Sequence, residues 1–126
     1  MPLSSSGVLA FIVSVSLLVA VVPAQTTPST QPHSENEKIE LLIFAVEQLH
    51  DATFIRNDVE YDCKAAAKHL RSKWDYARKK IKTAQQFIEY IGTQSSQSGK
   101  PYRIRFKDGT ELPSKEFFTR ELKKLD

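Results

Sequence analysis

The pattern of hydrophobic and polar positions predicts an amphipathic helix early in the charged part of the chain. Its apolar residues recur at spacings of three and four, which places them on one helical face: Ile39, Leu42, Ile43, Val46 and Leu49. Ser34 and Glu37 precede this stripe at capping-box spacing, in which the serine oxygen accepts a backbone amide of the first turn. We therefore expect a first helix within residues 34–52.

Two more helices are predicted in the middle of the chain. Asp62 can cap a long helix over residues 63–81, whose buried face is formed by Ala66, Leu70, Trp74, Ala77 and Ile81. Thr83 and Gln86 repeat the capping-box spacing and predict a third helix over residues 84–91. Gly92 is expected to end that helix in the left-handed conformation that glycine adopts readily.

Alternation of side chains predicts a β-hairpin over residues 102–112. The first strand has an apolar and a cationic face, formed by Tyr102, Ile104 and Phe106 and by Arg103, Arg105 and Lys107. A three-residue loop over 107–109, with Gly109 left-handed, pairs Ile104 with Leu112 and Arg105 with Glu111. A two-residue loop would place Leu112 on the cationic face, so we expect the longer loop.

A second short hairpin and a final helix complete the predicted fold. Strand-forming residues flank a turn at Asn57 and Asp58, which predicts either a short hairpin near 54–61 or a structured turn. Ser114 follows Pro113 and is expected to cap a helix whose buried stripe is Phe117, Phe118, Leu122 and Leu125. The fold class is therefore α+β, with three to four helices packed with a small antiparallel β-hairpin (residues 102–112) and the second hairpin near 54–61.

The N-terminal part of the sequence has the features of an export signal. The first 24 residues contain no charged side chain, and small residues at Val22 and Ala24 predict cleavage between Ala24 and Gln25. We expect a signal peptide over 1–24, a flexible Pro-, Ser- and Thr-rich linker over 25–35 and a single domain over 36–126, in the periplasm or secreted from a bacterium. An uncleaved N-terminal anchor is the alternative, because no Lys or Arg precedes the apolar run 7–22.

Charge is divided unevenly along the expected domain. Residues 35–62 carry eight acids and two bases, whereas residues 63–107 carry twelve bases and two acids. The two segments would screen each other if they lay side by side, and any remaining cations would face anionic lipid headgroups or polysaccharide. The expected partners are therefore an acidic envelope protein or an anionic envelope polymer, and export argues against nucleic acid.

The cysteine and histidine content gives no indication of a metal site or a cofactor. Cys63 is the single cysteine, and it is either a buried inert thiol or a site that pairs with another chain. His33, His50 and His69 show no ligand spacing with Cys63, so neither zinc nor another cofactor is expected.

Three segments in order carry a resemblance to a known family. They are "FIRNDVEYDCKAAAKHL", "KIKTAQQFI" and "SSQSGKPYRIRFKDG". The chain resembles the YfeK-like family of small exported bacterial proteins, a domain of unknown function. The resemblance implies a periplasmic setting and an α+β domain, and it brings no activity, cofactor or catalytic residue. Asp58 stands where the family pattern has Gly after Asn57, which argues against a tight primed turn there.

Polar and cationic residues supply one candidate binding surface and no assigned catalytic residue. The candidates are Arg56, His69, Lys73, Ser96, Ser98, Lys100, Arg103 and Arg105. If they converge, they form a positive surface suited to an anionic group. We therefore expect a non-enzymatic interaction or anionic-ligand-binding module of the cell envelope. The alternative is a small periplasmic hydrolase that uses His69 and a loop serine, although the chain has no G-x-S-x-G or H-E-x-x-H motif.

Overall fold

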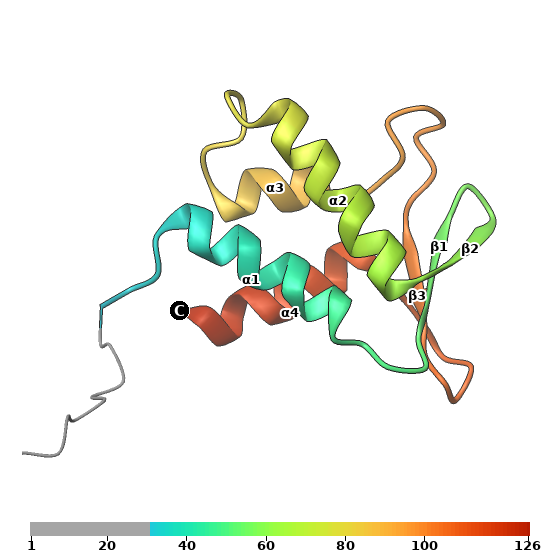
Figure 1. Cartoon of the computed structure of the whole chain (residues 1–126). Helices are drawn as coiled ribbons and strands as arrows, with labels where there is room; N and C mark the ends of the chain where they lie inside the picture. The colour runs from blue at the N-terminus through green and yellow to red at the C-terminus, as the bar shows by residue number, and fades with distance from the viewer. Residues whose placement is uncertain (1–30) are drawn as a thin grey trace, which may run out of the picture. The chain divides into compact units, whose positions relative to one another are not determined.

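The structure is a computed structural model and describes residues 31–126; the expected signal peptide and most of the expected linker lie outside this part of the chain. Its elements in order are α1 (Glu35–Glu47), β1 (Thr53–Arg56), β2 (Val59–Asp62), α2 (Cys63–Ala77), α3 (Ala84–Tyr90), β3 (Arg103–Arg105), β4 (Glu111–Pro113) and α4 (Ser114–Leu125). The helices lie on one side of the sheet (Figure 1). The predicted α+β class is confirmed.

The two predicted hairpins join into one antiparallel sheet with the strand order β2-β1-β3-β4. Ile104 pairs with Leu112 and Arg105 with Glu111, and Gly109 has a φ of 88°, so the predicted register and loop are confirmed. The contact between the hairpins is the pairing of β1 with β3, in which Phe54 lies opposite Ile104. No local sequence pattern predicted this pairing.

The turn between β1 and β2 is tight and primed, contrary to the expectation from Asp58. Asn57 and Asp58 have φ angles of 51° and 62°, the values that a two-residue primed turn requires. Asp tolerates the left-handed region better than most residues. The Asp58 carboxylate also accepts a hydrogen bond from Lys100 Nζ at 2.7 Å, which holds the turn in place.

Three of the predicted helix caps are present. The side chains of Ser34, Asp62 and Thr83 accept backbone amides at the starts of α1, α2 and α3, and Thr83 and Gln86 form a complete capping box. The second helix is shorter than predicted: α2 ends at Ala77. Ile81 is buried as expected, but it lies in the segment after the helix.

Two predictions about helix ends are wrong. Gly92 is not left-handed, since Gly99 and Gly109 are the glycines with positive φ in residues 31–126. Gly92 is instead needed for space, because a Cβ there would lie 2.8 Å from the Phe118 ring. Ser114 does not cap α4, which Pro113 precedes without a side-chain hydrogen bond. The buried Ser114 hydroxyl donates to the carbonyl of Gly92 and ties the start of α4 to the end of α3.

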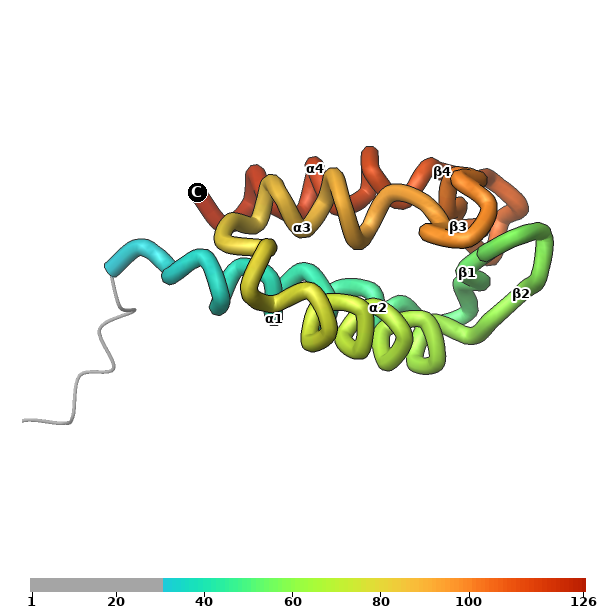
Figure 2. Tube along the Cα trace, turned by 90° about the horizontal axis from the view of Figure 1, so that it is seen from above, coloured from blue at the N-terminus to red at the C-terminus, as the bar shows by residue number. Residues whose placement is uncertain are grey.

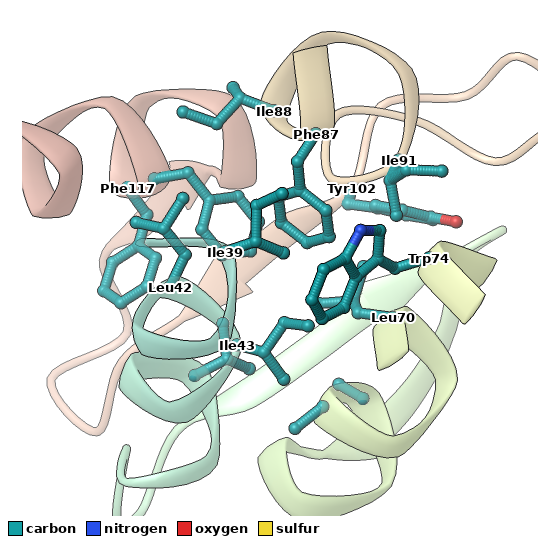
Figure 3. Packing of buried hydrophobic residues seen from close by; sticks show 14 of the residues in the cluster. Ile39, Leu42, Ile43, Leu70, Trp74, Phe87, Ile88, Ile91, Tyr102 and Phe117 are labelled. Atoms are coloured by element: carbon teal, nitrogen blue, oxygen red, sulfur yellow. The ribbon is translucent and has the colours of Figure 1, made fainter. Parts of the chain in front are cut away.

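The core lies between the helices and the inner face of the sheet. Figure 2 shows the helices as two pairs, α1 beside α2 and α3 beside α4. Figure 3 shows aromatic and aliphatic side chains from these helices meeting around Trp74 and Tyr102, which are almost fully buried. Cys63 is also buried, as one of the two alternatives predicted, and its free thiol donates to the Ala52 carbonyl at 3.4 Å.

Candidate functional site

The structure separates the predicted binding residues into three places. Arg56, His69 and Lys73 lie between β1 and α2, and with Tyr102 we call them the inner cluster. Arg103 and Arg105 lie on the outer face of the sheet, near Lys100. Ser96 and Ser98 belong to the loop between α3 and β3. The fold therefore does not bring all eight predicted residues together into one continuous surface.

The outer-face cations are each paired with a carboxylate. Arg105 pairs with Glu60, and Arg103 Nη1 is 2.9 Å from the Glu111 carboxylate. Lys100 Nζ is 2.7 Å from the carboxylate of Asp58. Most of these acids come from the acidic segment 35–62, so the screening considered from the charge pattern occurs on this face.

These outer-face ion pairs also cover an apolar residue. Ile55 lies on the outer face of β1, opposite Glu60 on one side and Arg103 on the other, and it is only 4% exposed. The long side chains of its paired neighbours keep water from it. The outer face is therefore close to neutral and has a structural role.

The loop serines mostly organise the loop itself. The buried Ser95 hydroxyl accepts from the Asn57 amide at 3.2 Å, and Ser98 donates to the Asn57 side-chain oxygen. Ser98 Oγ also accepts the backbone amide of Lys100 at 3.2 Å. These bonds fasten the loop to the β1–β2 turn. Ser96 is the exception, because it lines a hollow together with Lys73.

The inner cluster is built by one helix and the inner face of the sheet. His69 and Lys73 are one turn apart on α2 and therefore share a helix face. Arg56 points to the same side of β1 as the core residue Phe54, because side chains two apart on a strand share a face. Tyr102 enters the cluster from the residue before β3, with its hydroxyl at the edge of the core group (Figure 3).

Lys73 is the anchor of this cluster. Its Nζ donates to the carbonyls of Ile91 at 3.1 Å and Gln94 at 3.3 Å, and to the Tyr102 hydroxyl at 3.0 Å. The ammonium group also lies 5.1 Å from the centre of the Tyr102 ring. Lys73 thereby connects α2 to the end of α3 and to the chain that enters β3.

The inner cluster contains positively charged side chains that have no carboxylate partner in residues 31–126. Burial and the Arg56 guanidinium lower the pKa of Lys73 from its ordinary value of 10.5 to about 8. Burial, Arg56 and Lys73 together lower the pKa of His69. Within residues 31–126, none of these three side chains forms an ion pair with a carboxylate. At neutral pH the cluster therefore holds two positive charges and a neutral imidazole.

Two buried nitrogen atoms of the cluster have no hydrogen-bond partner. They are Arg56 Nε and His69 Nε2, and the third such side-chain atom in residues 31–126 is Trp74 Nε1 in the core. Leaving a buried polar atom unpaired costs about 1–3 kcal/mol, so such groups call for a partner. The unpaired N–H of Arg56 beside uncompensated positive charge is suited to an anionic acceptor.

Sequence reasoning did not include Tyr102 or the outer-face carboxylates in the candidate site. The alternating pattern of residues 102–107 correctly placed Tyr102 in the core, but nothing local indicated that its hydroxyl would meet Lys73, which is 29 positions away. The acidic run 35–62 was the available signal for Asp58 and Glu60, although it did not specify their partners.

No three His, Cys, Asp or Glu side chains in residues 31–126 are grouped so that they could hold a metal ion. None of the helices there combines the length and the apolar composition that crossing a membrane would require.

Comparisons with known proteins agree with the resemblance found in the sequence. Residues 33–126 match the family described as "Family of unknown function (DUF5329)". The chain is also 41% identical over 68 residues to the uncharacterised protein YfeK of Salmonella typhimurium strain LT2. That match covers 54% of this chain and 57% of YfeK, so it spans little more than half of the relative. No solved structure matches the chain.

Proposed function

We propose that this chain, which belongs to the family of unknown function DUF5329, is an exported, non-enzymatic module that binds an anionic group at the inner cluster. The observation that carries the proposal is that Arg56, His69 and Lys73 meet without a carboxylate partner among the described residues 31–126. Buried positive charge without a counter-charge is unfavourable in the free protein. An anion that enters the cluster supplies that counter-charge.

The hydrogen-bonding capacity of the cluster supports the same ligand class. Arg56 Nε is free to donate, the ring nitrogen His69 Nε2 has no partner in residues 31–126, and Tyr102 holds Lys73 at a fixed position next to them. A phosphate or carboxylate oxygen accepts hydrogen bonds from guanidinium and imidazole groups at once. In contrast, Lys100, Arg103 and Arg105 already have carboxylate partners and contribute little free positive charge.

The alternative of a hydrolase has less support in the geometry. Ser95 and Ser98 direct their hydroxyls to Asn57, and no hydrogen bond joins His69 to a serine in residues 31–126. A histidine base must lie within hydrogen-bond reach of the nucleophile that it activates. The arrangement of His69 between two cations instead favours a role in binding.

Binding is tested by titrating the ¹⁵N-labelled protein with inorganic phosphate while amide shifts are recorded, with chloride at equal ionic strength as the reference. Saturable shifts are expected near Arg56 and along residues 69–73 of α2. Arg56→Gln should weaken phosphate binding about tenfold or more, because a hydrogen bond to a charged group contributes about 1.5–3 kcal/mol.

The matched control is Lys68→Gln, which removes one exposed positive charge from the neighbouring position of α2. It should change the affinity little, because Lys68 lies outside the cluster. Equal losses for Arg56→Gln and Lys68→Gln, or shifts spread evenly over the surface, would show only general attraction of anions and would refute the site. Export is tested separately by intact mass, with a processed chain expected to begin at Gln25.

A further inference from the structure

The end of α2 that lies away from the sheet carries exposed tyrosines and lysines, which we call the basic tip. It consists of Tyr76, Lys79, Lys80, Lys82 and Tyr90, from the end of α2, the following loop and the end of α3. Figure 1 shows this loop at the opposite end of α2 from the strands. The basic tip is thus distinct from the paired cations of the outer sheet face.

The lysines of the basic tip lack counter-charge in residues 31–126. Asp75 and Glu35 are the acids that line a hollow with these lysines, and neither forms an ion pair with them within residues 31–126: Asp75 is 3.3 Å from Arg78, and the Glu35 carboxylate accepts the amide of Ala84 at 3.2 Å. Lys79, Lys80 and Lys82 are exposed and form no ion pair in the described part of the chain. Their charge is therefore available to an external anionic surface.

Aromatic side chains accompany this charge. Tyr76 is 96% exposed and Tyr90 is 67% exposed, the two highest values among the large hydrophobic residues of the described chain. Together they line a hollow of about 460 Å³ whose other walls include Ala77, Ile81 and Ile91. A tyrosine ring with an apolar body and a polar tip suits the boundary between lipid chains and headgroups.

The chain also enters the domain next to the basic tip. Ser34, Glu35 and Asn36 line a hollow of about 1110 Å³ together with residues 75–82. The chain therefore enters the domain at the end that carries the lysines. The exposed rings of Tyr76 and Tyr90 at this end favour a lipid surface as the occupant over a dissolved polyanion, because a polyanion in solution offers no boundary between apolar chains and headgroups.

From the charge and the exposed tyrosines, we propose that the basic tip docks on an anionic bilayer surface. Tyr76 and Tyr90 lie at headgroup level in this arrangement, and the three lysines face lipid phosphates. Each lysine near an anionic membrane strengthens binding about fivefold. Lys73 of the inner cluster also lines the hollow beside the two tyrosines. The docking surface does not include Arg56 or His69, so Arg56→Gln separates docking from anion binding at the inner cluster.

Docking is tested by co-sedimentation of the processed chain, which begins at Gln25, with vesicles that contain phosphatidylglycerol and with vesicles of phosphatidylcholine alone. The proposal expects binding to the anionic vesicles that weakens with salt. Changing Lys79, Lys80 and Lys82 together to Gln should reduce it about a hundredfold, at about fivefold for each lysine. Every variant begins at Gln25, so differences between variants report on the basic tip.

The matched control changes Lys64, Lys68 and Lys115 to Gln, which removes the same charge from exposed positions elsewhere. This control should retain most of the binding, and Arg56→Gln should retain all of it. Tyr76→Ser with Tyr90→Ser should weaken anionic-vesicle binding severalfold. Equal losses in the two lysine triples, no effect of the tyrosine changes, or equally strong binding to dissolved dextran sulfate would each overturn docking on a bilayer.

Discussion

Replacing Gly92 with alanine should destabilise the fold, because the added methyl group would meet the ring of Phe118. The new Cβ would lie 2.8 Å from Cε2 and 2.9 Å from Cδ2 of that ring, closer than carbon atoms approach in proteins. Phe118 has no exposed surface, and its ring packs edge-on against Phe87 and Phe117 at centroid distances of 5.7 Å. The ring therefore cannot turn away into solvent.

The backbone at Gly92 is held as firmly as the ring. Its amide donates to the Phe87 carbonyl at 2.9 Å, and its carbonyl accepts the hydroxyl of Ser114. Forcing an extra carbon into a packed core of this kind costs about 1–3 kcal/mol. For a domain of this size, that loss lowers Tm by about 4–20 °C. Urea and thermal unfolding followed by circular dichroism measure both quantities.

A double-mutant cycle with Phe118→Leu tests the stated cause. The smaller side chain makes room for the Cβ, so Gly92→Ala should cost about 1 kcal/mol less in the Phe118→Leu background than in the wild type. Strictly additive losses would refute the clash as the reason. A neutral or stabilising Gly92→Ala would refute it too, because alanine then gains the entropy advantage over glycine without a steric cost.

Three further measurements probe the hairpin, the core and the inner cluster. Gly109→Val should lower the free energy of unfolding in urea by about 1 kcal/mol or more, because the backbone at Gly109 has a φ of 88°. A Cβ at this position would meet nothing within 4 Å, so backbone strain is the sole cause, and a variant as stable as the wild type would refute it. Ile104→Ala should cost about 2–5 kcal/mol, since Ile104 is fully buried at the centre of the sheet, and a loss below 1 kcal/mol would contradict that role. Lys73 has a pKa of about 8 when folded and about 10.5 when unfolded, so between these values the unfolded state binds more protons and the free energy of unfolding should rise with pH. Lys73→Met should lack this rise, and phosphate affinity should fall above pH 8 as Lys73 loses its charge.

Local signals were sufficient for most of the secondary structure. Ser34, Asp62 and Thr83 cap their helices because a cap joins residues only two or three positions apart. The register of β3 and β4 followed from alternation and from the three-residue loop at Gly109, which are also local. The Gly92 and Ser114 predictions were local in the same sense, yet both residues are used in a contact between α3 and α4.

The arrangement of charge needed the tertiary structure. Whether a cation meets a carboxylate or another cation depends on which distant segments pack together, and composition is the same in either case. The pairing of β1 with β3 brings Glu60 to Arg105, 45 positions away, and so neutralises a cation that sequence alone left available. The packing of α2 against β1 brings Arg56 to His69 and Lys73 and leaves them without a carboxylate partner in the part of the chain that the structure describes. Sequence determined the elements and their faces, and the fold decided which charges remain free, because electrostatic partners are set by distance in space.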